Sequence, residues 1–251
     1  MPAAERHQGR IVLITGAANG IGAATALAFA AAGATVVLVD IDAAAMAETR
    51  AALAGAGHLA MRLDVTSDAD WQAAMAQVGA AFGRLDVLVN NAGWGELRSI
   101  FDTTPDQWRR VLAINLDSVF LGTMAAMPWL EKSGDAAIVN VSSIRSRVVG
   151  FGAGAYSAAK AGVEMFSRVA AVECAQTGRR VRVNSIHPGF VDTPLSQAIG
   201  EEAREARRRS VPQGRLAEPA EIAAGILFLA SREASYVNGA ALVVDGAFTA
   251  V

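Results

Sequence analysis

Tyr156 and Lys160 stand four positions apart in the alanine-rich segment AYSAAK. On a helix this spacing puts both side chains on one face, where they can reach the same cleft. A free phenol titrates near pH ~10, which is too high for efficient proton exchange with an alcohol at neutral pH. An ammonium about 5 Å away, at an effective dielectric of ~20, favours the phenolate by roughly 3 kcal/mol and would make Tyr156 a working acid/base. The plainer alternative is a packed Tyr with a solvated Lys one turn on.

Three more polar residues could join this pair. Ser142 and Ser143 close the apolar run 137–141, and a hydroxyl at such a strand end can hydrogen-bond a substrate oxygen and stabilise its charge. Either serine could instead bond only the adjoining turn. Asn115 interrupts an otherwise good helical sequence, in which Asn is a poor residue, so its place needs a reason. A buried amide that bonds a kinked backbone would be such a reason, without any catalytic part.

The segment TGAANGIG, at 15–22, follows the first apolar run. Gly16, Gly20 and Gly22 allow a tight turn, a close approach to a pyrophosphate and the start of a helix whose amides face that anion. The alternative is a tight strand-helix turn with no ligand.

Asp40 ends the next apolar run, about 20 residues after the glycines. A carboxylate there accepts hydrogen bonds from ribose hydroxyls and repels a 2′-phosphate. No Arg or Lys stands beside it, because Asn19 occupies the glycine loop and Ile41 follows Asp40. The pattern therefore predicts NAD in preference to NADP.

Apolar runs that alternate with helix-length stretches must position these residues. Such alternation predicts an α/β fold, a single Rossmann-like doubly wound parallel sheet of about seven strands with helices on both faces. Thr66 or Ser67, and Thr104 before Pro105, are expected to cap helices. No linker or repeat divides the chain, so residues 1–251 are expected to form one domain. The expected strands are 11–14, 35–39, 59–63, 86–90, 137–141, 181–186 and 241–244.

Composition excludes several classes of protein. Hydrophobic residues make up 53% of the 251 residues, and a net charge of −2 gives no electrostatic reason to expect nucleic acid or an anionic membrane as partner. The stretch between Arg10 and Asp40 holds no charge, but glycines and polar residues divide it too finely for a membrane span. Cys174 is the single cysteine, and residues 1–10 lack the apolar region of a secretory signal. A cytoplasmic location is expected.

Four motifs in order, TGAANGIG, NNAG (90–93), YSAAK (156–160) and HPG (187–189), resemble the short-chain dehydrogenase/reductase family over residues 10–251. The resemblance implies hydride transfer between NAD and a secondary alcohol or ketone. It makes Tyr156 the acid/base and Lys160 the group that tunes the phenol and binds the cofactor ribose. It selects Ser143 over Ser142 as the partner of the substrate oxygen, and it places Asn115 in a proton relay.

The resemblance also implies a set of cofactor-binding residues, in addition to Tyr156 and Lys160. For some of them a structural alternative stays open: Asp64 could only cap the next helix, and NNAG could be only a strand-ending turn. The expected cofactor-binding residues are Gly16, Asn19, Gly20, Ile21, Gly22, Asp40, Ile41, Asp64, Val65, Asn91, Ala92, Gly93, Pro188, Gly189, Val191 and Thr193.

The family's variable substrate lid corresponds to about 192–215 and contains GEEAREARRR at 200–209. The three arginines 207–209 could bind a carboxylate or phosphate. The spacing favours a solvated helix face with Glu201–Arg204 and Glu205–Arg209 pairs, so no acidic substrate is inferred. HPG also occurs in family members that resemble hydroxysteroid and cyclic or aryl alcohol dehydrogenases, so the resemblance implies a bulky neutral substrate, cyclic, aryl or hydroxysteroid-like. The expected pocket residues are Trp94, Glu96, Ile144, Arg145, Phe151 and Phe190.

His187 is expected to be a hydrogen-bonded structural residue, and since His7 and His58 give no ligand spacing, no metal is predicted. Stretches 105–130 and 156–177 resemble the helices that pair across subunits in this family, usually in tetramers, although their Ala, Met and Val content could equally belong to the core. Ala247, in VDGAF, replaces a glycine that is commoner in the family and would alter the packing of the tail.

Three rival functions stay open. A 3-oxoacyl-carrier-protein reductase would suit the arginines, but most such relatives use NADPH, against which Asp40 argues. A catalytically silent NAD-binding regulator and a purely structural oligomer would have no need of Ser143, Tyr156 and Lys160.

Overall fold

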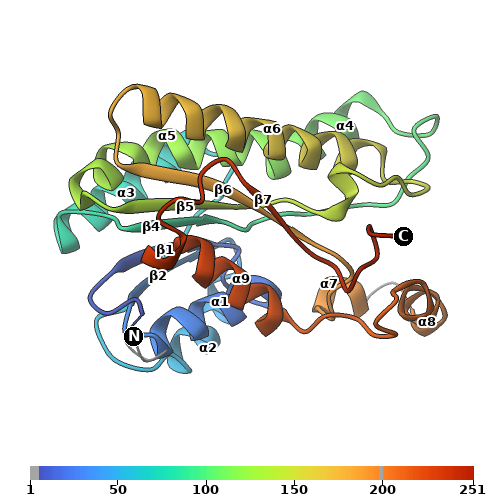
Figure 1. The fold of residues 1–251 in the computed structure, drawn as a ribbon, viewed down its shortest axis with the longest axis horizontal. Coiled ribbons are helices and arrows are strands. Elements are labelled where there is room, and N and C mark those ends of the chain that lie inside the picture. The colour runs from blue at the N-terminus through green and yellow to red at the C-terminus, as the bar shows by residue number, and fades with distance from the viewer. Residues whose placement is uncertain (1–5, 198–199) are drawn as a thin grey trace.

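The computed structural model describes residues 6–197 and 200–251. Its centre is a parallel sheet in the strand order β3-β2-β1-β4-β5-β6-β7 (Figure 1). Every strand expected from the sequence is present, so the doubly wound α/β fold is confirmed. The strands are β1 (Ile11–Thr15), β2 (Thr35–Asp40), β3 (Leu59–Arg62), β4 (Val87–Asn90), β5 (Ala136–Val141), β6 (Val181–Pro188) and β7 (Ala241–Val244).

The sheet is apolar on both faces because helices cover both. In β1, Val12 and Ile14 belong to one apolar core, while Ile11 and Leu13 belong to the other. Burial on both sides explains why the strands read as continuous apolar runs rather than as alternating patterns. One face is covered by α3 (Asp68–Phe82), α5 (Ser118–Leu130) and α6 (Gly154–Gln176), and the other by α1 (Gly20–Ala31), α2 (Ala43–Ala51) and α9 (Pro219–Ala230) (Figure 1).

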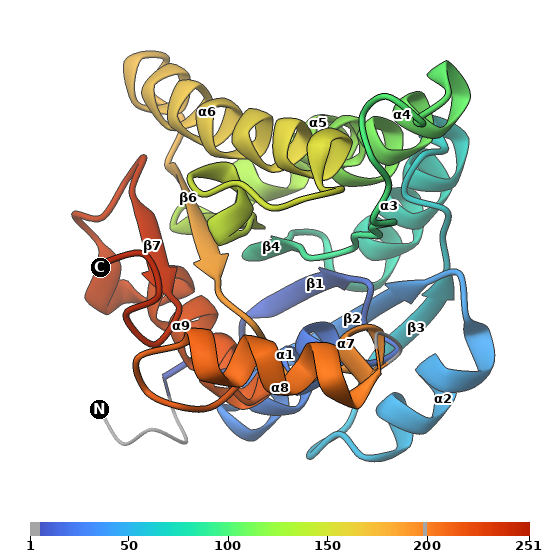
Figure 2. The same ribbon diagram turned by 90° about the vertical axis from the view of Figure 1, so that its right-hand side faces the viewer.

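The strand order reverses between β1 and β4, which lie side by side although two strands separate them in the chain. At such a point the connections leave in opposite directions and open a crevice at the carboxyl ends of the strands. Two lid helices, α7 (Pro194–Gln197) and α8 (Glu201–Ser210), project beyond that edge (Figure 1) and face the viewer in Figure 2. The reversal and the lid define where a ligand can bind.

Local sequence decides where the helices begin. Ser67, and not Thr66, caps α3, because its Oγ accepts the Asp70 amide at 3.1 Å. Thr104 and Gln107 form a capping box at the start of α4 (Pro105–Leu112), with Pro105 in its first turn, as expected.

The stretch 105–130 is not one regular α-helix. A π-helical turn, η2 (Ala113–Asp117), separates α4 from α5. Within the described ranges, Pro105–Ser133 is the one helical run whose length and apolar composition would suffice to cross a membrane, a test that core helices of other proteins also pass. Here the run packs against β4, β5 and α3.

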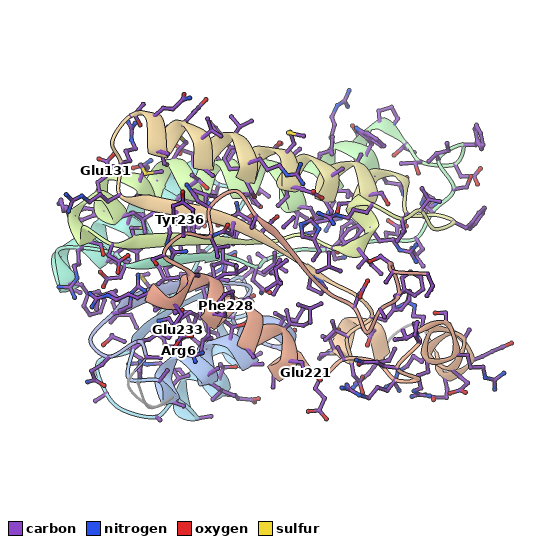
Figure 3. All side chains as sticks on the ribbon, in the orientation of Figure 1. Arg6, Glu131, Glu221, Phe228, Glu233 and Tyr236 are labelled. Carbon is purple, nitrogen blue, oxygen red and sulfur yellow. The ribbon has the colours of Figure 1, made fainter. Side chains whose placement is uncertain are left out.

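The segment before β1 is tied to the far end of the chain. Arg6 pairs with Glu233, in the turn η5 (Arg232–Ala234), at 3.3 Å, and Figure 3 shows the two labelled side chains together. The His7 ring lies 3.2 Å from the Leu227 carbonyl. Ala247 has φ +70°, and no other described residue except glycine has a positive φ.

Candidate active site

A cavity of about 840 Å³ opens at the carboxyl edge of the sheet. Every residue that the sequence assigned to the site lines it, except Gly22 and Asn115, which lie behind its wall. The cavity thus gathers residues from the loop after β1 to α8. Lining residues that the sequence analysis did not assign to the site include Leu97, Arg110, Ile114, Ser196 and Arg207.

The glycine loop is fixed by close backbone contacts. A Cβ on Gly16, whose φ is +64°, would come within 2.9 Å of the Ala92 Cα, and one on Gly22 would overlap the Gly16 carbonyl oxygen at 2.0 Å. Thr15 Oγ1 accepts the amides of Asn91 and Ala92, both at 2.9 Å, and so locks the loop to the segment after β4. Gly22 does not line the cavity, but its lack of a side chain lets helix α1 approach the glycine loop that does.

The residues of this region fit a dinucleotide. No side chain caps α1 after Asn19, so the first amides of the helix stay open to an anion. Asp40 Oδ2 accepts the Ala18 amide at 3.0 Å and Oδ1 accepts the Asp42 amide at 3.0 Å, which holds the carboxylate at the end of β2 with lone pairs to spare. The glycine loop has no room for additional Cβ atoms and, with the open amides of α1, suits a pyrophosphate. The Asp40 carboxylate suits a ribose diol.

One basic residue, Arg62, lies near Asp40 although the sequence shows none beside it. Arg62 lies opposite Asp40 in the register of β2 and β3. Its guanidinium approaches Asp70 at 4.0 Å and does not line the cavity. Strand register, which brought the two residues together, is not visible in the sequence.

Tyr156 and Lys160 project from one face of α6 into the cavity, as their spacing predicted. The Lys160 Nζ lies 5.6 Å from the centre of the Tyr156 ring and donates to the Val141 carbonyl at 2.9 Å. Burial lowers the pKa of Lys160 to about 8. This lysine is therefore a poorly solvated cation beside the phenol.

The pKa of Tyr156 shifts in the direction opposite to expectation. Burial raises it, against the smaller lowering effects of the Ser143 hydroxyl and the Arg145 charge. Desolvation of the phenolate is the largest cause, whereas the spacing of Tyr156 and Lys160 had suggested a pKa lowered by the ammonium. Without a bound cofactor the phenol is protonated at neutral pH.

The two serines differ in what they bond. The Ser142 hydroxyl donates to the Lys160 carbonyl at 2.8 Å and is used inside the fold. Ser143 Oγ accepts the Arg145 amide at 3.1 Å and keeps its own proton for a partner in the cavity. The geometry favours Ser143, the residue that the family resemblance selected.

His187 supports the main chain of Ser143 from below. Its Nδ1 lies 3.2 Å from the Ser143 carbonyl and 3.0 Å from Ser146 Oγ, and its Nε2 lies 2.8 Å from Ser185 Oγ. The ring is fully buried, and burial lowers the pKa of His187, so it is neutral. The structural role expected for this histidine is confirmed.

Asn115 uses its amide to hold neighbouring backbone. Its Nδ2 donates to the Trp94 carbonyl at 2.6 Å and to the Val111 carbonyl at 2.9 Å, and its Oδ1 accepts the Trp94 amide at 3.2 Å. The bond to Val111 bridges the start of the π turn. A Cβ on Gly93 would lie 2.9 Å from the Asn115 Oδ1 and 3.4 Å from the Lys160 Nζ, so these two groups meet behind Gly93.

The remaining expected pocket residues and their neighbours along the cavity include both apolar and charged groups. Ile144 is buried, while Phe151 stands at the rim with 91% of its surface exposed. Glu96 is paired with Arg98 at 2.6 Å. The Arg110 guanidinium lies 5.0 Å from the centre of the Trp94 ring.

The prediction of a solvated face for arginines 207–209 is wrong at Arg207. Arg208 and Arg209 pair with Glu205, at 2.9 and 3.0 Å, and Arg204 pairs with Glu201 at 3.0 Å. Arg207 instead lines the cavity, 5.1 Å from the centre of the Phe190 ring. The sequence held a signal, since the positions three and four before Arg207 are Arg204 and Ala203, neither of them acidic.

Known proteins resemble the chain over almost its whole length. Residues 16–249 match the family model described as Enoyl-(Acyl carrier protein) reductase. Over 98% of its length the chain is 42% identical to cyclopentanol dehydrogenase of Comamonas sp. (strain NCIMB 9872), of which it covers 99%. It is 45% identical, over 96% of its length, to cis-4-hydroxycyclohexanecarboxylate dehydrogenase of Sinomonas cyclohexanicum, of which it covers 97%.

Two further matches bear on cofactor and fold. The NADP-dependent (R)-specific alcohol dehydrogenase of Lentilactobacillus kefiri is 36% identical over 98% of the chain and 99% of that protein. The crystal structure of gox2181 matches with a TM-score of 0.92 at 30% identity, over 99% of each chain.

Proposed function

Because the chain belongs to the short-chain dehydrogenase/reductase family, we propose that it interconverts a secondary alcohol and a ketone with NAD as the hydride carrier. The observation that carries the proposal is the convergence of Ser143, Tyr156 and Lys160 on the cavity that the glycine loop and Asp40 also line. Relatives named for cyclopentanol and for cis-4-hydroxycyclohexanecarboxylate support a cyclic alcohol or ketone as substrate.

Each of the three side chains has a task in this reaction. A bound nicotinamide would supply the hydride chemistry. The Ser143 hydroxyl donates to the substrate oxygen, and the Tyr156 phenol gives its proton to that oxygen in ketone reduction or takes the proton back in alcohol oxidation. Lys160 holds a positive charge behind the phenol and supplies donors for the cofactor ribose.

Replacement of Tyr156 by Phe tests the mechanism. The variant Tyr156→Phe keeps the ring and removes the proton that is transferred, so turnover is expected to fall about 10²- to 10⁴-fold. Nicotinamide absorbance measures the rate, and calorimetric titration with the cofactor checks that the binding site is intact. Full activity in this variant would refute the assignment.

The choice of NAD rests on Asp40, whose carboxylate would repel a 2′-phosphate. One relative is named as NADP-dependent, so the two cofactors are to be compared directly with a panel of cyclic, aryl and steroid alcohols. Asp40→Asn keeps the size of the side chain but removes its charge, and it is expected to lower the ratio of kcat/KM with NAD to kcat/KM with NADP. Turnover with NADP alone would refute the preference for NAD. Turnover of carrier-linked 3-oxoacyl groups alone would show that the substrate is not a free cyclic alcohol or ketone.

We further propose that the protein assembles as a homotetramer. Large apolar side chains stand exposed on α5 and α6, among them Phe120 (50%), Met124 (58%) and Met165 (57%). Phe228 on α9 and Tyr236, which precedes the edge strand β7, are exposed as well (Figure 3). Exposed apolar surface of this kind supports burial between subunits. Light scattering at assay concentration tests the assembly, and a stable monomer would contradict it.

A further inference from the structure

Two guanidinium groups lie over the ring of Phe190 inside the cavity. Arg145 comes from the short turn after β5, and its guanidinium carbon is 5.7 Å from the ring centre. Arg207 comes from α8, and its guanidinium carbon is 5.1 Å from the same centre. Both residues line the cavity and are partly buried. Elements far apart in the chain thus bring two positive charges to one aromatic ring.

Neither charge is neutralised within residues 6–197 and 200–251. Arg145 donates to the Val149 carbonyl, and no carboxylate forms a salt bridge with Arg145 or Arg207. The other arginines of α8 are all paired with glutamates or with Asp192. The glutamate that lines the cavity, Glu96, is held by Arg98. The two charges over Phe190 are therefore left to face the cavity.

This arrangement is unfavourable until an anion binds. Burial, and after it the charge of Arg145, lower the pKa of Arg207 from its ordinary value, which reports the cost of burying this cation near a second one. A guanidinium nevertheless stays protonated in a protein, so the repulsion persists. Two parallel N–H donors of an arginine match the two oxygens of a carboxylate, and a partly buried site strengthens such a bond.

We propose that Arg145 and Arg207 bind a carboxylate of the substrate, which makes the substrate a small hydroxy or oxo acid rather than a neutral alcohol or ketone. This inference rests on the proposed function and narrows its substrate class. Arg145 follows Ser143 by two residues, and its charge acts on Tyr156, so the anion site lies close to the reacting oxygen. That closeness suits an acid whose carboxylate stands a short ring or chain away from the reacting carbon.

A matched pair of substrates tests the inference. The probes are 4-hydroxycyclohexanecarboxylate and its carboxamide, which share the ring and the hydroxyl but differ in charge. The wild-type protein is expected to favour the acid in kcat/KM. In Arg207→Met, which keeps an unbranched apolar stem, the ratio of acid to amide is expected to fall about 10- to 100-fold. Arg207→Lys keeps the charge without the planar fork and should lose less.

Arg209→Met is the matched control. It removes the same charge from the same helix, but Arg209 is exposed and paired with Glu205, so the ratio of acid to amide should stay within about twofold of wild type. Circular dichroism and thermal melting verify that all variants fold. Titration calorimetry of the acid against wild type and Arg207→Met gives a second readout that needs no turnover, with weaker binding expected in the variant.

The outcomes separate the two proposals. If the wild type oxidises the amide and neutral alcohols but does not prefer the acid, or if Arg207→Met leaves the ratio unchanged, the carboxylate site is refuted while the proposed function stands. If no alcohol is turned over but the acid still binds more weakly to Arg207→Met, the reaction is wrong and the anion site stands. Equal losses for acid and amide would assign Arg207 a merely structural role and overturn the inference.

Discussion

Replacing Lys160 by Met should stabilise the protein while removing its activity. Lys160 is 3% exposed, its ammonium has the Val141 carbonyl as hydrogen-bond partner, and burial lowers its pKa from 10.5 to about 8. Since one pKa unit corresponds to about 1.4 kcal/mol, keeping this group charged costs the fold about 3 kcal/mol at neutral pH. Met has a similar length and no charge. Loss of the bond to Val141 takes back about 1 kcal/mol, so a net gain of about 2 kcal/mol is expected.

The pH dependence identifies the cause of that gain. The folded protein releases the Lys160 proton near pH 8, whereas the unfolded chain keeps it until about pH 10.5. Between these values the unfolded state binds more protons, so wild-type stability rises with pH. The advantage of Lys160→Met is therefore complete below pH ~8 and disappears as the pH rises toward about 10.5.

Urea unfolding of both proteins at pH 7 and pH 9.5 measures this difference. Comparison at equal protomer concentration removes the contribution of assembly, and subtraction of the two proteins cancels other titrating groups. At pH 7 the variant should also melt roughly 4–8 °C higher. A variant less stable than wild type at pH 7, or a difference that is the same at both pH values, would refute the reasoning.

Three other changes have definite expected outcomes. Arg145→Gln removes a charge that lowers the pKa of Tyr156, so the pH profile for oxidation of a neutral alcohol should shift to higher pH. An unchanged profile would show that the Arg145 charge does not act on the Tyr156 phenol. Ala247→Gly relieves a left-handed backbone and should raise the free energy of unfolding by about 0.5–1 kcal/mol in urea, and a decrease would contradict the strain. Burial lowers the pKa of His7 to about 4, so stability should fall as the pH drops from 6.5 to 4; His7→Gln should show a smaller fall in acid denaturation, and an equal one would exclude His7 as the cause.

The strands and the catalytic face of α6 could be predicted because their signals are local. Burial on both faces of the sheet writes a strand as an unbroken apolar run, as in β1 (Ile11–Thr15). The spacing of Tyr156 and Lys160 alone puts them on one side of a helix. A cap at the start of α3 also follows from residue type and from the acidic turn after it, although only the structure decides between Thr66 and Ser67.

What the sequence did not reveal depends on contacts between distant segments. Asn115 signalled a kinked backbone, but the bonds that join it to the Trp94 loop are contacts between distant segments that no periodicity encodes. The ion pairs of α8 follow from the spacing of its residues. Which side of α8 faces the cavity, and with it the place of Arg207, depends on how the lid packs against the rest of the fold. The direction of the Tyr156 pKa shift likewise depends on burial, and spacing gives no measure of burial.

The π turn also limits how this chain can change in length. Deleting one residue within η2 (Ala113–Asp117) would restore a regular helix and turn α5 by about 100° relative to α4. Side chains of α5 that now contact β4 and β5 would then point away from the sheet, and Asn115 would leave the Trp94 loop. Insertions and deletions are therefore expected to be selected against at this point, however freely they accumulate in loops, and an alignment gap between Leu112 and Ser118 would mark a protein that holds its Trp94 loop differently.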